Sequence, residues 1–174
     1  VNGIGGLGVH VLKLAKVLKA GRVIAIDVSD EKLKFAKRMG ADDVVNASTE
    51  DLGQRIKETT RGRLADVAVD LVGVGTIEKM IDCVGKGGRM VLVGIGQKEI
   101  RISPYHTIIG KEMDLLGVND HLSAELTELI RLVSSGKLDL SDSVTHRVSL
   151  EEVNSGFKIL EERIGNPIRV VVMK

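Results

Sequence analysis

Two patterns of apolar residues alternate along the first part of the chain. Short runs that are apolar at most positions, typical of buried strands, alternate with stretches in which apolar residues recur about every 3.6 positions, typical of helices packed on one face. Glycines stand at most of the transitions. This alternation predicts a parallel sheet wound by right-handed helical crossovers, a doubly wound α/β fold. The predicted strands are 22–27, 43–46, 65–72 and 89–94, and the predicted helices are 9–20, 30–39, 49–60 and 76–84.

Beyond residue 96 the pattern changes. Residues 97–112 hold one proline, Pro104, and little periodicity, which predicts a loop with a short extended piece. We divide the chain into a dinucleotide-binding domain at 1–142 and a C-terminal helix–strand segment at 143–174. The remaining predicted elements are strands at 113–118, 143–148 and 168–173, a helix from Ser123 to Gly136 that buries Leu126, Leu129, Ile130 and Val133, and a helix from the capping box at 149–152 to about 162.

A glycine-rich turn stands almost at the first residue. Gly3, Gly5 and Gly8 form G-x-G-x-x-G, with Gly6 and Leu7 inside the motif, and the predicted helix 9–20 follows it. In a dinucleotide-binding unit the first glycine permits the tight turn, the second lets backbone N–H groups approach a pyrophosphate, and the third lets the helix pack on the sheet. The helix N-terminus adds unpaired donors and a partial positive charge.

The strand after this helix ends in Asp27, which lies 19 residues beyond Gly8. At this spacing a carboxylate is expected to accept hydrogen bonds from the adenosine ribose hydroxyls. It would repel a 2′-phosphate, so NAD is favoured over NADP. Arg22 stands at the other end of the strand and is not placed to offset this repulsion.

Only Val1 and Asn2 precede the glycine turn. In a doubly wound fold the strand before this turn is the central one. A sheet without its central strand would leave unpaired backbone groups in the core. We therefore expect strand 1 to be truncated here and the natural protein to continue upstream of Val1.

Composition narrows the function classes. The 174 residues carry a formal net charge of +1, with 43% hydrophobic and 28% charged residues, so neither nucleic acid nor a membrane is an expected partner. Aromatic residues are too scarce for base-stacking platforms. The single cysteine, Cys83, forms no intrachain disulfide and reads as a small buried hydrophobe, which suits a cytoplasmic protein.

The order of these segments resembles the nucleotide-binding half of the medium-chain, zinc-type alcohol dehydrogenases. The likeness runs through GIGGLGVHVLKLAK, VIAIDVSDEKLKFAKRMGADDVVN, ADVAVDLVG, GGRMVLVGIG and GNPIRVVVMK. It implies a Rossmann domain that binds NAD in an enzyme interconverting an alcohol and an aldehyde or ketone. In that family the zinc and the proton relay belong to a separate catalytic domain, to which the C-terminal segment returns. The resemblance therefore implies a zinc-dependent whole enzyme whose zinc ligands are not in this chain.

The resemblance also implies which residues contact the cofactor. The motif residues meet the pyrophosphate, Asp27 and Lys32 the adenosine ribose, and Arg169 the phosphates. The ends of the fourth and fifth strands line the adenine and nicotinamide sides, and a sixth-strand backbone group meets the carboxamide. The full predicted set is Gly3, Gly5, Gly6, Leu7, Gly8, Asp27, Lys32, Leu71, Val72, Gly73, Val93, Gly94, Ile95, Val118 and Arg169.

No catalytic or metal-ligating residue is predicted within the chain. The four histidines, at positions 10, 106, 121 and 146, lack metal-ligand spacing. Two alternatives stay open: a zinc-independent quinone or enoyl reductase of the same superfamily, and a non-catalytic NAD-sensing domain such as that of a potassium-transport regulator. A short-chain dehydrogenase is excluded, because it needs Tyr-x-x-x-Lys and Tyr105 is followed four residues later by Ile109.

The predicted sixth strand is apolar and lies at a sheet edge. Met113, Leu115, Leu116 and Val118 give it a surface that could pair with another chain. The resemblance implies that this edge pairs with its two-fold mate, so we expect a homodimer, or a homotetramer, built through 113–118. The alternative is that residues 97–112 fold over the edge and cover it.

Overall fold

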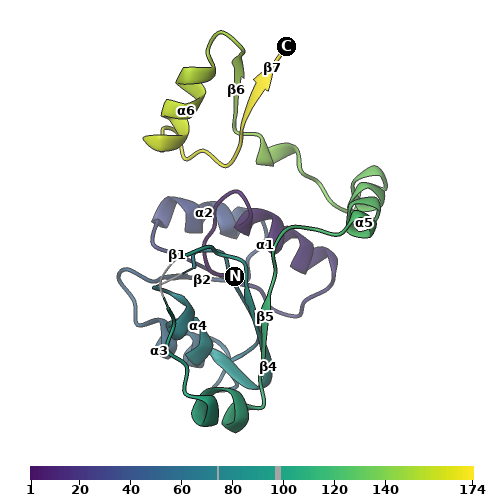
Figure 1. Cartoon of the computed structure of the whole chain (residues 1–174). Coiled ribbons are helices and arrows are strands. Elements are labelled where there is room, and N and C mark those ends of the chain that lie inside the picture. Colours follow the sequence, from purple (N-terminus) through teal and green to yellow (C-terminus); the bar gives the residue numbers. More distant parts are fainter. Residues whose placement is uncertain (74, 97–98) are drawn as a thin grey trace.

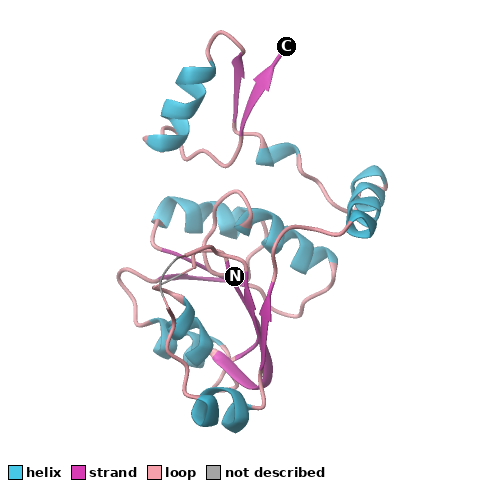
Figure 2. Cartoon of the chain, viewed as in Figure 1, coloured by secondary structure: helices cyan, strands magenta, loops and turns pink. Residues whose placement is uncertain are grey.

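A computed structural model describes residues 1–73, 75–96 and 99–174 (Figures 1 and 2). Helices and strands alternate as far as β5, and a separate helix–strand group follows. The elements are α1 (Gly8–Val17), β1 (Ile24–Asp27), α2 (Asp30–Arg38), β2 (Asp43–Asn46), α3 (Leu52–Thr59), β3 (Ala65–Asp70), α4 (Ile77–Asp82), β4 (Val84–Leu92), the π-helix η1 (Pro104–Ile109), β5 (Asp114–Gly117), α5 (Ser123–Ser134), the 3₁₀-helix η2 (Ser141–Ser143), β6 (His146–Ser149), α6 (Val153–Glu161) and β7 (Val170–Met173).

The pairing of the strands confirms the predicted parallel α/β fold. One group pairs β1 with β2 and another runs β3-β4-β5, with every pair parallel. Asn2 joins the two groups through parallel bridges to Ile26 of β1 and Asp70 of β3. The spatial order is therefore β2-β1-Asn2-β3-β4-β5, in which the residues before the glycine turn hold the place of strand 1. An apolar cavity of about 400 Å³, lined by Val1 and by both flanking strands, lies beside this bridge.

Side chains that alternate along β1 serve two cores. Ala25 packs in one core with Val9 and Leu12 of α1, and its neighbour Ile26 packs in the other with residues of α3 and α4. Successive strand residues point to opposite faces of a sheet, so the two cores lie on its two faces. This explains why the strand is apolar at successive positions rather than at every second one.

Most predicted helices are present, with corrections at their ends. The side chain of Ser29 caps α2, as predicted, and Gly40 follows that helix with φ +99°. Asp51, not Thr49, caps α3, because its carboxylate accepts from the backbone N–H of Gln54. Gly21 does not end α1, which stops at Val17 and is followed by Lys19 at φ +62°.

Three predictions beyond β3 were wrong in detail. The glycine-rich residues 85–88 belong to β4, whose register against β3 shifts there, so the strand begins at Val84 rather than at residue 89. The predicted loop at 97–112 contains the π-helix η1, opened by the side chain of Ser103. Ser123 is not the N-cap of α5, since the Glu125 carboxylate accepts from the backbone N–H of Leu122.

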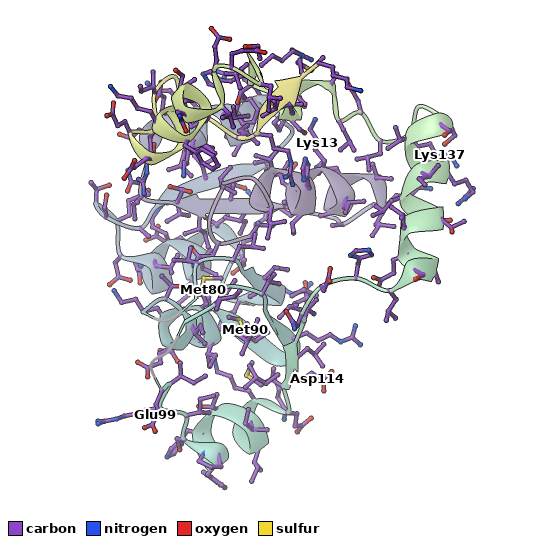
Figure 3. All side chains as sticks on the ribbon, turned by 45° about the horizontal axis from the view of Figure 1, so that its top comes forward. Lys13, Met80, Met90, Glu99, Asp114 and Lys137 are labelled. Carbon is purple, nitrogen blue, oxygen red and sulfur yellow. The ribbon has the colours of Figure 1, made fainter. Side chains whose placement is uncertain are left out.

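The apolar side of α5 is not buried as predicted. Leu126, Ile130 and Val133 are exposed, Leu129 is half-buried, and Leu132 is the buried residue. Both views place α5 to one side of the sheet (Figures 1 and 3), and Figure 3 labels Lys137, which follows this helix. The 3.6-residue spacing identifies the apolar side of a helix but not what covers it.

The last elements form a small β-α-β unit above α1 and α2 (Figure 1). Strands β6 and β7 pair in parallel, and α6 connects them. A Cβ on Gly156 would lie 3.2 Å from Cγ2 of Val148 and 3.3 Å from Cγ1 of Val170, so this glycine lets α6 pack close to both strands. We call this group the C-terminal unit (141–174). No helix of the described residues is long and apolar enough to cross a membrane.

Candidate functional site

Backbone contacts shape the glycine turn between Asn2 and α1. Gly3 has φ +90°, and its N–H donates to the carbonyl of Ile26 at 2.8 Å. A Cβ on Gly8 would lie 1.8 Å from the carbonyl oxygen of Gly3, a distance that no side chain tolerates. The first and third glycines of the motif are therefore required by the turn itself.

Gly5 differs from both, because a Cβ built there would meet nothing within 4 Å. It faces a cavity of about 480 Å³ that also borders the end of β1 and the C-terminal unit. We call it the glycine-turn cavity. Its size falls in the usual range for ligand sites. The lining residues are Gly3, Gly5, Gly6, Leu7, Gly8, Asp27, Val28, Lys32, Leu71, Val72, Arg163 and Arg169.

Asp27 ends β1 at one side of this cavity. Its Oδ2 accepts from the backbone N–H of Ile4 at 2.7 Å, and its Oδ1 accepts from those of Val28 and Ser29 at 2.8 and 3.0 Å. The carboxylate is thereby fixed in orientation and tied to the glycine turn. Since each carboxylate oxygen accepts two hydrogen bonds, Oδ2 retains capacity for a ligand hydroxyl. The Nζ of Lys32 lies 4.0 Å from Oδ2.

Asp70 was not among the predicted site residues. It ends β3, which lies on the other side of Asn2 from β1 and Asp27. The Asp70 carboxylate is 0% exposed. It accepts from the side chains of Asn2 and Thr76, both at 2.6 Å, and from the backbone N–H groups of Val72 and Gly73 at 3.1 and 2.6 Å. Asp70 thus holds the turn that carries Leu71 and Val72 into the cavity lining. An acid followed by glycines at the end of a predicted strand was the available signal.

The cavity carries more positive than negative charge. Lys32, Arg163 and Arg169 line it together with one carboxylate, Asp27. Arg163 follows α6 at φ +56° and was not among the predicted site residues, nor was the apolar Val28. Three cations against one anion leave a surplus of two positive charges, which suits a pyrophosphate with two negative charges.

Five predicted residues lie outside the lining of this cavity. They are Gly73, Val93, Gly94, Ile95 and Val118, which follow the carboxyl ends of β3, β4 and β5. A Cβ on Gly94 would lie 2.3 Å from the backbone nitrogen of Gly73, so the ends of β3 and β4 touch through glycines. Ile95 is 91% exposed. Contact of these residues with a cofactor stays a prediction.

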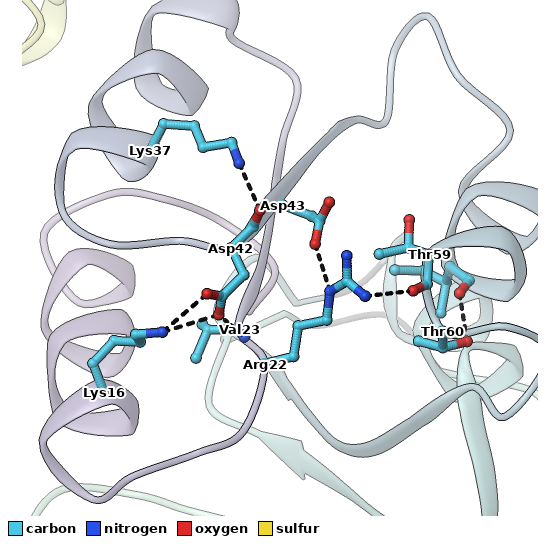
Figure 4. A network of polar contacts seen from close by, with 9 residues as sticks. Lys16, Arg22, Val23, Lys37, Asp42, Asp43, Thr59 and Thr60 are labelled. Carbon is cyan, nitrogen blue, oxygen red and sulfur yellow. Dashed lines mark hydrogen bonds and ion pairs between the residues drawn. The ribbon is translucent and has the colours of Figure 1, made fainter.

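Arg22 is held at the other end of β1, as predicted (Figure 4). Its Nε donates to Oδ2 of Asp43 at 2.6 Å and its Nη1 to the carbonyl of Thr59 at 3.0 Å. The hydrogen bond to Asp43 raises the pKa of Arg22, and the negative charge of that carboxylate adds to the effect. Arg22 is therefore not available to neutralise a 2′-phosphate at Asp27.

The described residues do not fit a zinc ion. No group of three or more His, Cys, Asp or Glu side chains there could hold one. His121 contacts Asp120, and His10 contacts Ser143 and Arg169. Cys83 is buried in the core, where burial first and Asp82 second raise the pKa of its thiol to about 11. A thiol held protonated is a poor zinc ligand.

Comparison with known proteins decides the family. The model of the family described as "Zinc-binding dehydrogenase" matches residues 6–135. The chain belongs to the zinc-binding dehydrogenase family. Its relatives include an L-threonine 3-dehydrogenase from Anaeromyxobacter dehalogenans, 32% identical over 99% of this chain and 49% of that protein. This family match confirms the resemblance drawn from the sequence.

Solved structures of alcohol dehydrogenases share the fold over the whole chain. An alcohol dehydrogenase from the archaeon Aeropyrum pernix superposes with a TM-score of 0.86 at 36% identity, over 100% of this chain and 49% of that one. A protein described as an NAD-dependent alcohol dehydrogenase superposes with a TM-score of 0.84 at 30% identity, over 99% and 49%. The chain spans about half the length of the relatives it matches. Family membership disfavours the NAD-sensing alternative, since these relatives are dehydrogenases.

Proposed function

We propose that this chain is the NAD(H)-binding part of an oxidoreductase that interconverts an alcohol and an aldehyde or ketone. The glycine-turn cavity carries this proposal. It combines an open position at Gly5, a fixed carboxylate at Asp27 and the cations of Lys32, Arg163 and Arg169. A dinucleotide needs these groups: room at the pyrophosphate, an acceptor for the ribose and positive charge for the phosphates.

Each part of the site has a separate task. The glycine turn and the start of α1 present backbone N–H donors to the pyrophosphate, and Arg169 adds a charged one. Asp27 accepts from the adenosine ribose and excludes a 2′-phosphate. The exposed Ile95 and Val118 offer apolar contact further along the carboxyl edge of the sheet, where we place the nicotinamide. When bound, the nicotinamide supplies or accepts the hydride.

We propose that zinc and the proton relay come from residues outside this chain. The described residues lack a zinc-binding group, so no zinc-dependent step is assigned to them. This polypeptide by itself is expected to oxidise no alcohol at a measurable rate, with or without added zinc. Turnover by this polypeptide in proportion to bound zinc would contradict the proposal that the zinc ligands lie outside it.

A pair of glycine variants tests the location of the cofactor. A Cβ meets open space at both Gly5 and Gly21, but only Gly5 lines the glycine-turn cavity. Gly5→Val should weaken NADH binding at least tenfold, because the side chain occupies the path of the pyrophosphate, whereas Gly21→Val should bind like the parent. The measurement is a titration of NADH fluorescence on full-length protein. Equal affinities for the parent and Gly5→Val would refute the proposed site.

We also propose a symmetric dimer built through β5. Among the named strands, β5 pairs only with β4, which leaves its other edge available, and Leu116 and Val118 are exposed there. Isoleucines of the 97–112 segment pack into the core, and the strand edge still keeps these two residues exposed. The N–H of Val118 donates to the carbonyl of Leu92 in β4 at 2.9 Å, so the N–H of Leu115, three positions earlier, faces the free edge. Leu115→Pro removes that donor and should give monomers or aggregates in sedimentation velocity. A monomer at high concentration for the unmodified full-length protein would contradict the proposal.

A further inference from the structure

One histidine joins the glycine turn to the C-terminal unit. His10 lies two residues after Gly8, in the first turn of α1. Its Nε2 is 2.8 Å from Oγ of Ser143, which is only 3% exposed. Its Nδ1 is 3.4 Å from Nη2 of Arg169, and this same nitrogen is 3.4 Å from the carbonyl oxygen of Gly6. The ring therefore stands between η2 and an arginine that lines the glycine-turn cavity.

The chemistry of Arg169 fixes the state of this ring. A guanidinium only donates hydrogen bonds, so Nδ1 of His10 must carry a lone pair. The proton of the neutral imidazole then lies on Nε2, which donates to the hydroxyl of Ser143. Protonation of Nδ1 would remove the acceptor and place a second positive charge beside the guanidinium.

The surroundings of His10 favour this neutral form. Burial lowers its pKa most, and the positive charges of Arg169 and Lys13 lower it further. Asp142, which forms an ion pair with Lys13, acts in the opposite direction. The imidazole is therefore uncharged at neutral pH.

We propose that His10 is a positioning residue that orients Arg169 toward the pyrophosphate of the bound dinucleotide. Arginine side chains lose considerable rotamer freedom when they are fixed. Two acceptors on one guanidinium nitrogen, at Gly6 and at His10, impose much of that restriction before the ligand arrives, so less is lost on binding. The inference rests on the proposed function for its ligand, but the contact between His10 and Arg169 exists without one.

Replacing His10 by Asn or by Gln distinguishes the contact of Nδ1 with Arg169 from the contact of Nε2 with Ser143. The side-chain oxygen of His10→Asn stands near the place of Nδ1 and can still accept from Arg169. The amide of His10→Gln stands near the place of Nε2 and retains only the bond to Ser143. We expect the Asn variant to bind NADH within about twofold of the parent, and the Gln and Leu variants to bind about fivefold more weakly.

A double-mutant cycle shows whether the effect passes through Arg169. His10→Leu should cause no further loss of NADH affinity in an Arg169→Gln background. Equal affinity of the parent and His10→Leu would overturn the proposal. So would equal losses in the Asn and Gln variants, or full additivity with Arg169→Gln, since those results describe a residue that only packs.

The acid side of the pH profile gives a second measurement. Because the pKa of His10 lies below its ordinary 6.5, the neutral contact is complete above that pH and is lost as pH falls below it. NADH affinity of the parent should fall there relative to His10→Asn, whose amide does not titrate. Parallel profiles for the two proteins would overturn the proposal.

The tautomer can be read without any cofactor. A long-range ¹H–¹⁵N spectrum of the ligand-free full-length protein should show His10 with its proton on Nε2. A proton on Nδ1 would overturn the proposal whether or not NADH binds. Failure of the parent to bind NADH, with the Nε2–H form present, would instead count against the proposed function alone.

Discussion

Two strand ends that flank Asn2 carry the same residue and serve opposite purposes. Asp27 at the end of β1 accepts three backbone N–H groups, remains 8% exposed and lines the glycine-turn cavity. Asp70 at the end of β3 accepts four donors and is 0% exposed. Asp27 can therefore still accept a hydrogen bond from a ligand, whereas all the hydrogen bonds of Asp70 are made within the protein.

The cause of this difference lies in what surrounds each acid. Asp70 meets two side-chain donors, Asn2 from the central position of the sheet and Thr76 from the start of α4. Asp27 accepts hydrogen bonds only from the backbone of its own turn and of the glycine turn, and the nearest side-chain cation, Lys32, stays 4.0 Å away. A carboxylate at a strand end is therefore a binding group only where neighbouring side chains leave it open.

The largest expected effect is on stability at Asp70. Asp70→Asn replaces one acceptor oxygen by an amide donor that faces existing donors. We expect a loss of about 3 kcal/mol in the free energy of unfolding, because buried partners are left unsatisfied. Urea unfolding of this variant and of Asp27→Asn, the matched change at the other strand end, measures the contrast. If Asp70→Asn lowers the free energy of unfolding less than Asp27→Asn does, Asp70 does not contribute more to stability than Asp27.

The next largest effect is expected on NADH binding, at Arg163 in the lining of the glycine-turn cavity. Arg163→Gln should weaken NADH binding about fourfold, by removing one of the positive charges near the pyrophosphate, and the weakening should shrink in high salt. Lys158→Gln, in the preceding helix α6 and outside the cavity lining, is the control. If both variants bind NADH equally well, Arg163 only borders the cavity.

The smallest effect is expected at Lys32. Its ammonium lies 4.0 Å from Asp27, beyond hydrogen-bond distance, and that carboxylate offsets much of its charge. Lys32→Gln should weaken NADH binding by about twofold and leave stability nearly unchanged. If Lys32→Gln loses more NADH affinity than Arg163→Gln in the same titration, Lys32 contributes more to binding than Arg163, contrary to this prediction.

Sequence patterns predicted the fold well because local and global signals agree in the first half of the chain. The strand at 43–46 and the cap at Ser29 were correct, since short apolar runs and side-chain caps depend on neighbouring residues. The π-helix at 104–109 and the strand start at Val84 were not predicted. Both depend on packing and on register with distant strands, which local spacing does not reveal.

The residues that line the glycine-turn cavity were predicted in part for the same reason. The glycine motif and Asp27 lie within one continuous β-α-β stretch, so their spacing carries the information. Arg163 was missed because chain folding, not spacing, brings it to the cavity, whereas Val28 directly follows Asp27 and its apolar side chain gave no sign of a role. The contact between His10 and Ser143 joins residues 133 positions apart, and a histidine on a helix gave no sign of it.

We propose that the open carboxylate of Asp27 gives this chain its preference for NAD. Calorimetry on full-length protein with NAD⁺ and NADP⁺, before and after Asp27→Ser, tests it most directly. We expect NAD⁺ to bind at least tenfold more tightly than NADP⁺, about 1.4 kcal/mol, and Asp27→Ser to narrow this difference in affinity. Equal affinities of the unmodified protein for the two cofactors, or tighter binding of NADP⁺, would contradict it.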